Sequence, residues 1–444
     1  ESYPAWGYPG ATITGTIDAS PNWYGSAAGP EFAKFYDDGL GTDNFEYTDP
    51  ADFTYIPWCS VANCSQTAGP VTNVTQHKGY ATIQAAIDDA TAGDTIHVAA
   101  GTYAEALTIN KQLTLSGPNA EINPNGGTRV AEATIVYPAG LIADKDLVSV
   151  SAAGVSFAGF TLDGRDLDAA LWGEGIYSEA NDLTVKNNIV KNFRQIGIRA
   201  GALYGGPYFT GALIENNQVT SDVSGFYFTY SGIYLQGTQG IVRGNVVDSA
   251  NRGIQIQPYK NPASTLGVVE NNTFAAYKSP LYFNYSENAN SNWVFRNNIL
   301  TGIASPTGTP VDYFAGITVQ TFYSGNVLFE RNQVNIGSAD ATAIYQYYEL
   351  GTVNGTRSAT PNWWGSILGP AAGRYSGTAA FDPWCGDAAC TFLVSATEPE
   401  VSGFYVEDGK LVLKGAISGT GGIVINEPLY ILLRDGTVIQ NSSP

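Results

Sequence analysis

The chain has 444 residues, of which 44% are hydrophobic and 14% are charged, and its formal net charge is −19. The hydrophobic content allows a large core, which excludes an intrinsically disordered protein. The acidic balance and the lack of a basic stripe exclude a nucleic-acid-binding surface. The sequence has no methionine and no apolar run of about 18 residues. We therefore expect a processed segment of a precursor, without a membrane span.

Two cysteine pairs and six glycosylation sequons indicate an extracellular protein. The cysteines have the same C-x4-C spacing in both pairs, which are Cys59/Cys64 and Cys385/Cys390. Such a pair could bind a metal ion, but the only histidines are His77 and His97. We therefore predict two local disulfides, which persist in oxidising compartments. The sequons, some of which arise by chance, are at Asn63, Asn73, Asn271, Asn284, Asn354 and Asn441.

The N-terminal segment, residues 1–78, contains the first copy of an unusual element. A strand that includes Ile13 and Ile17 precedes the motifs "PNWYGSAAGP" and "PWCSVANC". Pro and Gly favour tight turns, and Trp is suited to covering the side of a core, so the element is interpreted as structural. An acidic insertion lies between the two motifs. It is either a solvated loop or a Ca²⁺ site, with the candidate ligands Asp37, Asp38, Asp43 and Asp49. We expect no obligatory cofactor.

One short helix is predicted near residues 82–91. Ile83, Ala86, Ile87 and Ala90 fall on one face of this helix, and Gly93 stops it. No later stretch of the central region has a helical period, so the region 79–357 is expected to consist of strands.

The central region repeats a short pattern in which asparagines separate apolar residues. Its copies are "VKNNIV" (185–190), "IENNQV" (214–219), "VRGNVV" (242–247), "VENNTF" (269–274), "FRNNIL" (295–300) and "FERNQV" (329–334). Short strands that recur at this interval predict a solenoid with an apolar interior, and with Tyr and Thr outside. Asparagine tolerates left-handed backbone and can bond its counterpart one turn away, so we expect an asparagine ladder at one corner.

The run "YATIQAAIDDATAGDTIHVAAGTYAEALTINKQLTLSGPNAEI" (80–122) resembles the opening of right-handed parallel β-helix proteins of the pectin-lyase-like class. The resemblance implies an all-β, right-handed parallel β-helix with a short N-terminal capping helix and irregular PNW/PWC loop elements at both ends. The PNW element resembles modules of large secreted bacterial surface proteins. Because this fold is shared by lyases, hydrolases, adhesins and structural proteins, the resemblance leaves the function open.

A catalytic reading depends on one acidic cluster. Lyases on this fold need a base, often with Ca²⁺, and glycoside hydrolases need two carboxylates. The segment "LDGRDLD" supplies the candidates Asp163, Arg165, Asp166 and Asp168. "DG" is equally a turn signal, and the motifs "GHG" and "WIDH" of related enzymes are absent, so the sequence favours a non-enzyme. A carbohydrate-binding adhesin, with a sugar-stacking aromatic face, is a further alternative.

The PNW/PWC element recurs over 358–396, and Asn362 follows Asn22 by 362 − 22 = 340 residues. In the segment 397–444, "IVINEPLYI" repeats "LTINKQLTL" of residues 107–115 at an offset of 423 − 107 = 316 residues. The chain is thus expected to begin with the tail of one module and to end with the head of another. Apolar residues at these two ends are candidates for contacts between copies: Ile13, Ile17, Ile423, Ile425, Leu429 and Ile431.

The expectation that the chain begins with one module's tail and ends with another module's head leads to the main functional hypothesis. The protein is predicted to be a subunit of an extracellular filament or surface layer, assembled head to tail by strand complementation between its terminal regions. One covalent repeat of a giant surface protein is the competing explanation. A polysaccharide lyase or glycoside hydrolase, and a carbohydrate-binding adhesin repeat, remain alternatives, so polysaccharide is a possible partner besides other copies of the chain.

Overall fold

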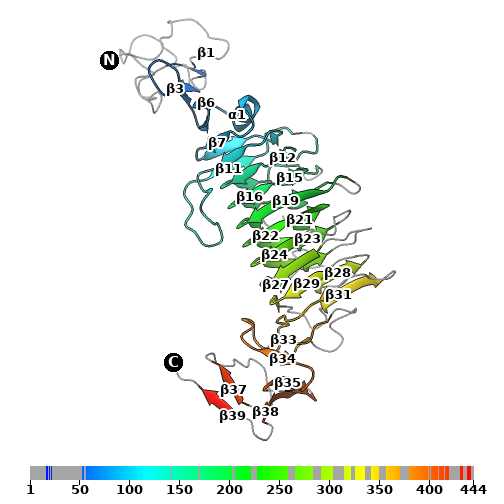
Figure 1. Ribbon diagram of the computed structural model, residues 1–444. Helices are drawn as coiled ribbons and strands as arrows, with labels where there is room; N and C mark the ends of the chain where they lie inside the picture. Colours follow the sequence, from blue (N-terminus) through cyan, green and yellow to red (C-terminus); the bar gives the residue numbers. More distant parts are fainter. Residues whose placement is uncertain are drawn as a thin grey trace, which may run out of the picture.

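The structure is a computed structural model, and it describes most of the chain from residue 57 onward and four short pieces before it. The described residues are 17–18, 20, 22, 53–54, 57–141, 143–168, 171–202, 206–221, 228–258, 266–283, 292–303, 315–321, 326–335, 342–349, 357–370, 380–398, 400, 402–408, 410–414, 416–419, 431–433 and 438–441. In Figure 1 the molecule is a long rod, with the first described strands at one end of it and the last described strands at the other.

The only α-helix of the described residues, α1 (Ile83–Asp89), covers the N-terminal end of the rod. Its buried residues are Ile83, Ala86 and Ile87, as the periodicity predicts. The Thr82 side chain accepts a hydrogen bond from the Ala85 N–H and caps the first turn. The helix ends at Asp89, before Gly93, because the backbone is already extended at Ala90.

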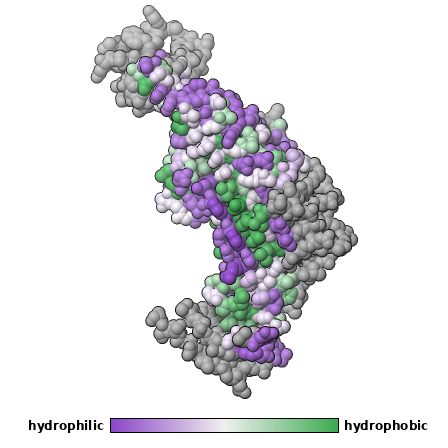
Figure 2. Space-filling model, viewed as in Figure 1, coloured by the Kyte–Doolittle hydropathy of each residue, from purple (hydrophilic) through white to green (hydrophobic). Residues whose placement is uncertain are grey.

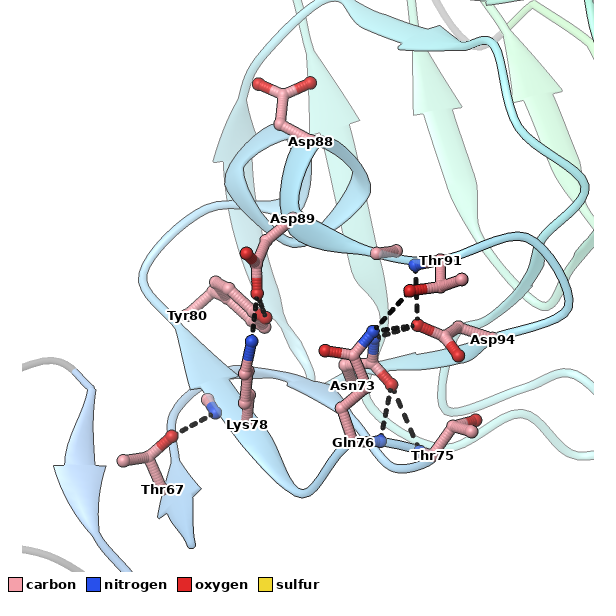
Figure 3. Close-up of polar contacts among 12 residues, drawn as sticks. Thr67, Asn73, Thr75, Gln76, Lys78, Tyr80, Asp88, Asp89, Thr91 and Asp94 are labelled. Atoms are coloured by element: carbon pink, nitrogen blue, oxygen red, sulfur yellow. Dashed lines mark hydrogen bonds and ion pairs between the residues drawn. The ribbon is translucent and has the colours of Figure 1, made fainter. Parts of the chain in front are cut away.

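Polar contacts attach this end to the first strands (Figure 3). Lys78 Nζ lies 2.7 Å from Asp89 Oδ2, and the Tyr80 hydroxyl donates to the same carboxylate. Asp94 accepts hydrogen bonds from Asn73 Nδ2 at 2.8 Å and from the Thr91 N–H at 2.8 Å. These bonds join β6 (Lys78–Tyr80) to the end of α1, and β5 (Val71–Asn73) to the segment that follows α1.

The rod is a coil with three parallel faces. The first face contains β7 (Thr95–Val98), β10 (Thr114–Ser116), β13 (Ser156–Ala158), β16 (Thr184–Lys186), β19 (Phe209–Glu215), β22 (Thr238–Arg243), β24 (Leu266–Glu270), β26 (Asn292–Arg296), β29 (Val327–Glu330) and β32 (Arg357–Ser358). The second face contains β8 (Gly101–Ala104), β11 (Ala133–Val136), β14 (Thr161–Asp163), β17 (Ile189–Lys191), β20 (Gln218–Thr220), β27 (Ile299–Gly302) and β30 (Gln333–Asn335). The third face contains β9 (Leu107–Ile109), β12 (Val148–Val150), β15 (Ile176–Ser178), β18 (Ile196–Ala200), β21 (Phe228–Gln236), β28 (Ala315–Thr321) and β31 (Thr342–Glu349). The long strands β23 (Val246–Gln257) and β25 (Thr273–Phe283) bend from the second face into the third.

Each strand pairs in parallel with the strand one turn away, so equivalent residues form rows along the rod. An inward row of the first face consists of Leu115, Phe157, Val185, Ile214, Val242, Val269, Phe295 and Phe329, all at most 3% exposed. This parallel β-helix confirms the predicted fold class. The expectation that Tyr lies outside is wrong for Tyr137, which is 2% exposed and donates its hydroxyl hydrogen to the Lys145 carbonyl oxygen at 2.8 Å.

The predicted asparagine ladder lies at the corner between the first and second faces. It consists of seven buried residues, Asn188, Asn217, Asn245, Asn272, Asn298, Asn332 and Asn362. The backbone N–H and Nδ2 of each donate to Oδ1 of the next, at 2.8–3.1 Å. The coil therefore extends beyond the predicted bounds of 79–357. It begins with β5 and includes Asn362 of the second PNW motif in its last turn.

Candidate functional site

The acidic cluster predicted around Asp163 is a structural turn. The Asp163 side chain is bound by Arg165 Nε at 2.8 Å and by Asn192 Nδ2 at 2.8 Å, and Lys191 Nζ lies 3.6 Å away. Burial opposes ionisation of Asp163, but the bonds from Arg165 and Asn192 hold its pKa below the usual range. Asp166 and Asp168 are exposed. Hence Asp163 is held as a charged acceptor that fixes the turn.

A different polar cluster lies on the third face, where Glu174 and Arg199 form an ion pair. Arg199 Nη1 is 2.9 Å from Glu174 Oε1, and Arg199 Nη2 is 2.5 Å from Gln236 Oε1. The guanidinium lies between the rings of Tyr177 and Tyr234, at 4.9 and 5.6 Å from their centroids. Strand register explains this arrangement, because Tyr177, Arg199 and Tyr234 occupy the same position on three successive strands.

Burial tunes the acids of this cluster. It raises the pKa of Glu174 to about 7, against the opposing effect of the Arg199 charge, and the nearby Asp146 adds to the rise. Burial also raises the pKa of Asp146, whose Oδ1 accepts a hydrogen bond from the Glu174 N–H at 3.1 Å. Glu174 Oε2 and Arg199 Nε are buried without a hydrogen-bond partner. The pair therefore offers a proton acceptor beside a fixed cation.

The cluster continues along the rod to Arg252. Its guanidinium lies 4.2 Å from the Tyr282 ring centroid and 4.9 Å from that of Tyr230, and Nη1 donates to Gln255 Oε1 at 3.0 Å. The third face thus presents two arginines, each between two tyrosines. From the sequence, Glu174, Arg199 and Arg252 are expected only as possible neighbours of the Asp163 cluster on adjacent turns. Their contacts with one another and with Gln236 could not be predicted, because residues 25 to 37 positions apart meet only through the strand register.

The predicted calcium ligands and glycosylation sequons lie in different parts of the chain. No cluster of His, Cys, Asp or Glu able to hold a metal ion occurs within the described residues. The Ca²⁺ candidates Asp37, Asp38, Asp43 and Asp49, together with the sequon asparagines Asn284 and Asn354, lie outside them. Asn73 is unsuitable as a glycan acceptor in the folded protein, because its side chain is fully buried and Nδ2 donates to Asp94. Asn63 and Asn271 are exposed, and Asn441 ends β39 (Val438–Asn441).

The second PNW–PWC element forms a joint at the end of the coil. We call the segment from a PNW motif to the following PWC hairpin a PNW–PWC joint. In the first copy the two motifs are residues 21–23 and 57–59, and in the second they are residues 361–363 and 383–385. In the second copy the Cys385 N–H donates to the Asn362 carbonyl oxygen at 3.0 Å. Trp364 and Trp384 are buried, and Trp384 Nε1 donates to the Ile367 carbonyl oxygen at 2.9 Å. The joint therefore packs directly against the last turn of the ladder.

The first copy of the joint repeats the backbone contacts of the second. The Cys59 N–H donates to the Asn22 carbonyl oxygen at 3.0 Å. Strand β1 (Ile17–Asp18) pairs in parallel with β2 (Phe53–Thr54), as Ser358 does with Ala380 in the second copy. Both copies contain the predicted disulfide, Cys59–Cys64 and Cys385–Cys390. Both also form an antiparallel PWC hairpin, β3 (Trp58–Cys59) with β4 (Thr67–Ala68), and β33 (Trp384–Cys385) with β34 (Leu393–Ser395).

A new coil begins after each joint. After the second joint, β35 (Gly403–Glu407) runs antiparallel to β36 (Lys410–Lys414), which pairs in parallel with β38 (Ile431–Leu433). This order matches β5, β7 and β10 of the main coil. The parallel pair of β37 (Ala416–Gly419) and β39 matches β8 and β11. Of the predicted contact residues, Ile17 lies in β1 and Ile431 in β38, whereas Ile13, Ile423, Ile425 and Leu429 lie outside the described residues.

The chain was compared with known proteins. A solved alginate lyase from Paenibacillus sp. is 17% identical, with a TM-score of 0.43, and the match covers 67% of this chain and 96% of the lyase. A mannuronan C-5 epimerase A-module from Azotobacter vinelandii is 16% identical, with a TM-score of 0.30 and coverage of 62% and 94%. Endopolygalacturonase I from Stereum purpureum is 15% identical, with a TM-score of 0.26 and coverage of 65% and 94%.

No curated protein matches the sequence. Within the described part of the chain, no helix is long and apolar enough to cross a membrane. Residues 151–334 match the family model described as "right handed beta helix region". These residues contain most of the three-faced coil described above, which is therefore a right-handed parallel β-helix.

Proposed function

We propose that this protein is a structural unit of an extracellular rod or filament, in which successive β-helical coils are joined end to end through the PNW–PWC joint. The observation that carries the proposal is that the joint occurs twice with the same internal contacts. In the second copy it connects the last turn of one coil, at Asn362, to the first strands of another, β35 and β36.

The two joints differ in the strand pairing that the described residues show. Strand β32 lies between β29 and Ala380, whereas among the described residues its counterpart β1 pairs only with β2. A coil end without a neighbour exposes backbone hydrogen-bonding groups and an apolar cross-section. Another copy can cover it with the coil segment that begins at β35. Such head-to-tail pairing uses different surfaces on the two partners, so it produces an open filament.

This proposal is tested by comparing the full chain with two variants. Deleting residues 401–444 removes the second coil segment, and Asn22→Ala removes the side-chain amide equivalent to that of Asn362, which accepts the ladder bonds from Asn332. Asn63→Ala, in the exposed loop of the same joint, is the matched control. Electron microscopy and sedimentation velocity should show long rods for the full chain and the control, and short particles for both variants. Rods of unchanged length in the deletion variant would contradict the proposal.

The Glu174–Arg199 pair supports a second candidate, a polysaccharide lyase. An acid whose pKa burial raises to about 7 can accept a proton near neutral pH, and the arginine could neutralise the carboxylate of a uronic acid residue. Incubation with uronic acid polymers, monitored by the ultraviolet absorbance of unsaturated products, tests this function. Wild-type activity that is lost in Glu174→Gln would support it, and no product from the wild type would exclude it. Binding of the polymer without cleavage would instead favour an adhesin.

A further inference from the structure

The first face of the coil carries two neighbouring surface rows of contrasting character. Alternate residues of a strand point away from the core, so the parallel register aligns them along the rod. One row alternates strictly in charge, in the order Lys186, Glu215, Arg243, Glu270, Arg296 and Glu330. The adjacent row is aliphatic and consists of Leu213, Ile241, Val268, Val294 and Leu328. Figure 2 shows a hydrophobic patch beside a hydrophilic band in the middle of this face.

Both rows are accessible from solvent. Ile241 is 38% exposed, and the other four aliphatic residues are partly exposed. The side chains of Arg243 and Arg296 are 43% and 45% exposed, and each forms an ion pair within the row, at 2.6 Å to Glu215 and at 2.7 Å to Glu270. Single exposed apolar residues are ordinary on protein surfaces, whereas a continuous aliphatic stripe over five turns is a feature of interaction surfaces.

The charge of this face favours contact with another copy. The three cations and three anions of the charged row cancel, although the whole chain carries a formal charge of −19. Repulsion between two copies is therefore weakest where these faces meet. An alternating row with an even number of members also has a symmetry property, because reading it backwards exchanges every positive position for a negative one.

We propose that the first face is a lateral interface between two copies of the chain, packed antiparallel about a two-fold axis perpendicular to the rod. The contact is isologous, since both copies use the same surface. The reversed charged row then faces itself with opposite charges throughout: Lys186 meets Glu330 of the second copy, Glu215 meets Arg296, and Arg243 meets Glu270. In the aliphatic row, Ile241 faces Val268. This pairing is lateral, so it goes beyond end-to-end joining and would bundle rods.

A parallel arrangement does not match these rows. A two-fold axis along the rod keeps the order of the residues and reflects their positions across the face. If the axis passes along the charged row, like charges meet at every turn. If the axis runs between the two rows, the charged row covers the aliphatic row, and burying charges against apolar groups is unfavourable. Only the antiparallel arrangement places every charge of the row on an opposite charge and at the same time pairs the central aliphatic residues, Leu213 with Val294 and Ile241 with Val268.

The loop of residues 117–132 is compatible with the antiparallel arrangement. Asn125 Nδ2 donates to the carbonyl oxygens of Asn217 and Gly244, at 3.3 and 3.0 Å, and Arg129 Nη1 donates to that of Asn187 at 2.9 Å. The loop therefore lies at the corner beside the first half of the charged row. In a reversed second copy, the same loop lies beside the other half, so the two loops occupy different parts of the interface.

The test uses charge reversal in the full chain. Arg243→Glu and Glu270→Arg each create like-charge contacts, and they should weaken lateral pairing by at least about tenfold. An equimolar mixture of the two variants should pair again, because Glu at position 243 of one copy meets Arg at position 270 of the other. The double variant should also pair. Small-angle X-ray scattering gives the mass per unit length, which doubles on lateral pairing, whereas end-to-end growth changes only the length.

Three controls make this experiment decisive. Lys78→Glu alters an exposed ion pair away from the face and should leave pairing unchanged. Ile241→Glu tests the aliphatic row separately, should the reversed charges disturb folding, and circular dichroism checks the fold of every variant. A wild type with the mass per length of a single rod, or single variants that pair as the wild type does, would overturn the proposal. Failure of the mixture to recover would exclude the antiparallel register.

Discussion

Replacing Asn272 with alanine tests whether the asparagine ladder holds the coil together. Asn272 is 1% exposed, and its Oδ1 accepts from the backbone N–H and Nδ2 of Asn245, both at 2.9 Å. Its Nδ2 donates to the Val242 carbonyl oxygen at 2.9 Å. Alanine removes the acceptor of one buried N–H and the side-chain donor of one buried carbonyl. At about 1–3 kcal/mol for each buried group that loses its partner, the variant should lose about 2–6 kcal/mol of unfolding free energy.

The neighbouring residue provides a matched control. Asn271 is exposed and has a left-handed backbone with φ of 56°, which glycine adopts without strain. Asn271→Gly should therefore change the unfolding free energy by less than about 1 kcal/mol. Urea denaturation followed by tryptophan fluorescence measures both variants, with the buried Trp293 as a nearby reporter. If the two variants shift the denaturation midpoint equally, the hydrogen bonds of the ladder are not what stabilises the coil, and the argument is refuted.

Two further predictions concern the acid of the third face and the second disulfide. Because burial raises the pKa of Glu174 from 4.5 to about 7, the unfolded chain releases this proton more readily, so stability should fall as pH rises from about 4.5 to about 7. Glu174→Gln should remove this part of the pH dependence of Tm, and an unchanged profile would contradict the assignment. Replacing Cys385 and Cys390 together with serine opens a ring with a sequence separation of 5 and should cost about 2 kcal/mol in denaturant unfolding. No change in midpoint would show that the loop is held by its packing alone.

Local patterns in the sequence predict most of the coil. The asparagine pattern is sufficient for the ladder, since Asn298 and Asn332 bond at 2.8 Å although 34 residues separate them. The interval between successive ladder asparagines varies because the loops differ in length, whereas the number of residues between each asparagine from Asn188 to Asn332 and its flanking strands stays constant. The face of α1 and the two disulfides are similarly local, because their residues lie within a few positions of each other.

The functional surfaces depend on register, which is harder to predict. Glu174 meets Arg199 only because β15 and β18 pair with their residues offset by 22 positions. Asp163, which the sequence offers as a catalytic candidate, accepts a hydrogen bond from Asn192 of the next turn, a contact that local sequence does not reveal. The alternating charges were visible in the sequence, since each charged residue ends the strand before an asparagine corner, as Lys186 and Glu215 do. Their significance appears only when the turns are stacked.

The asparagine ladder also gives the rod a direction. Six of the seven amides, Asn188 to Asn332, each donate from Nδ2 to Oδ1 of the next asparagine toward the C-terminal end, so these six bonds all run in one direction. At one end, Asn188 Oδ1 faces the Phe160 N–H, and at the other, Asn362 has accepted its bonds from Asn332. A single rod built on this ladder is therefore polar, and its two tips would differ in their capacity to add a new subunit, whereas an antiparallel pair of rods has two equivalent tips.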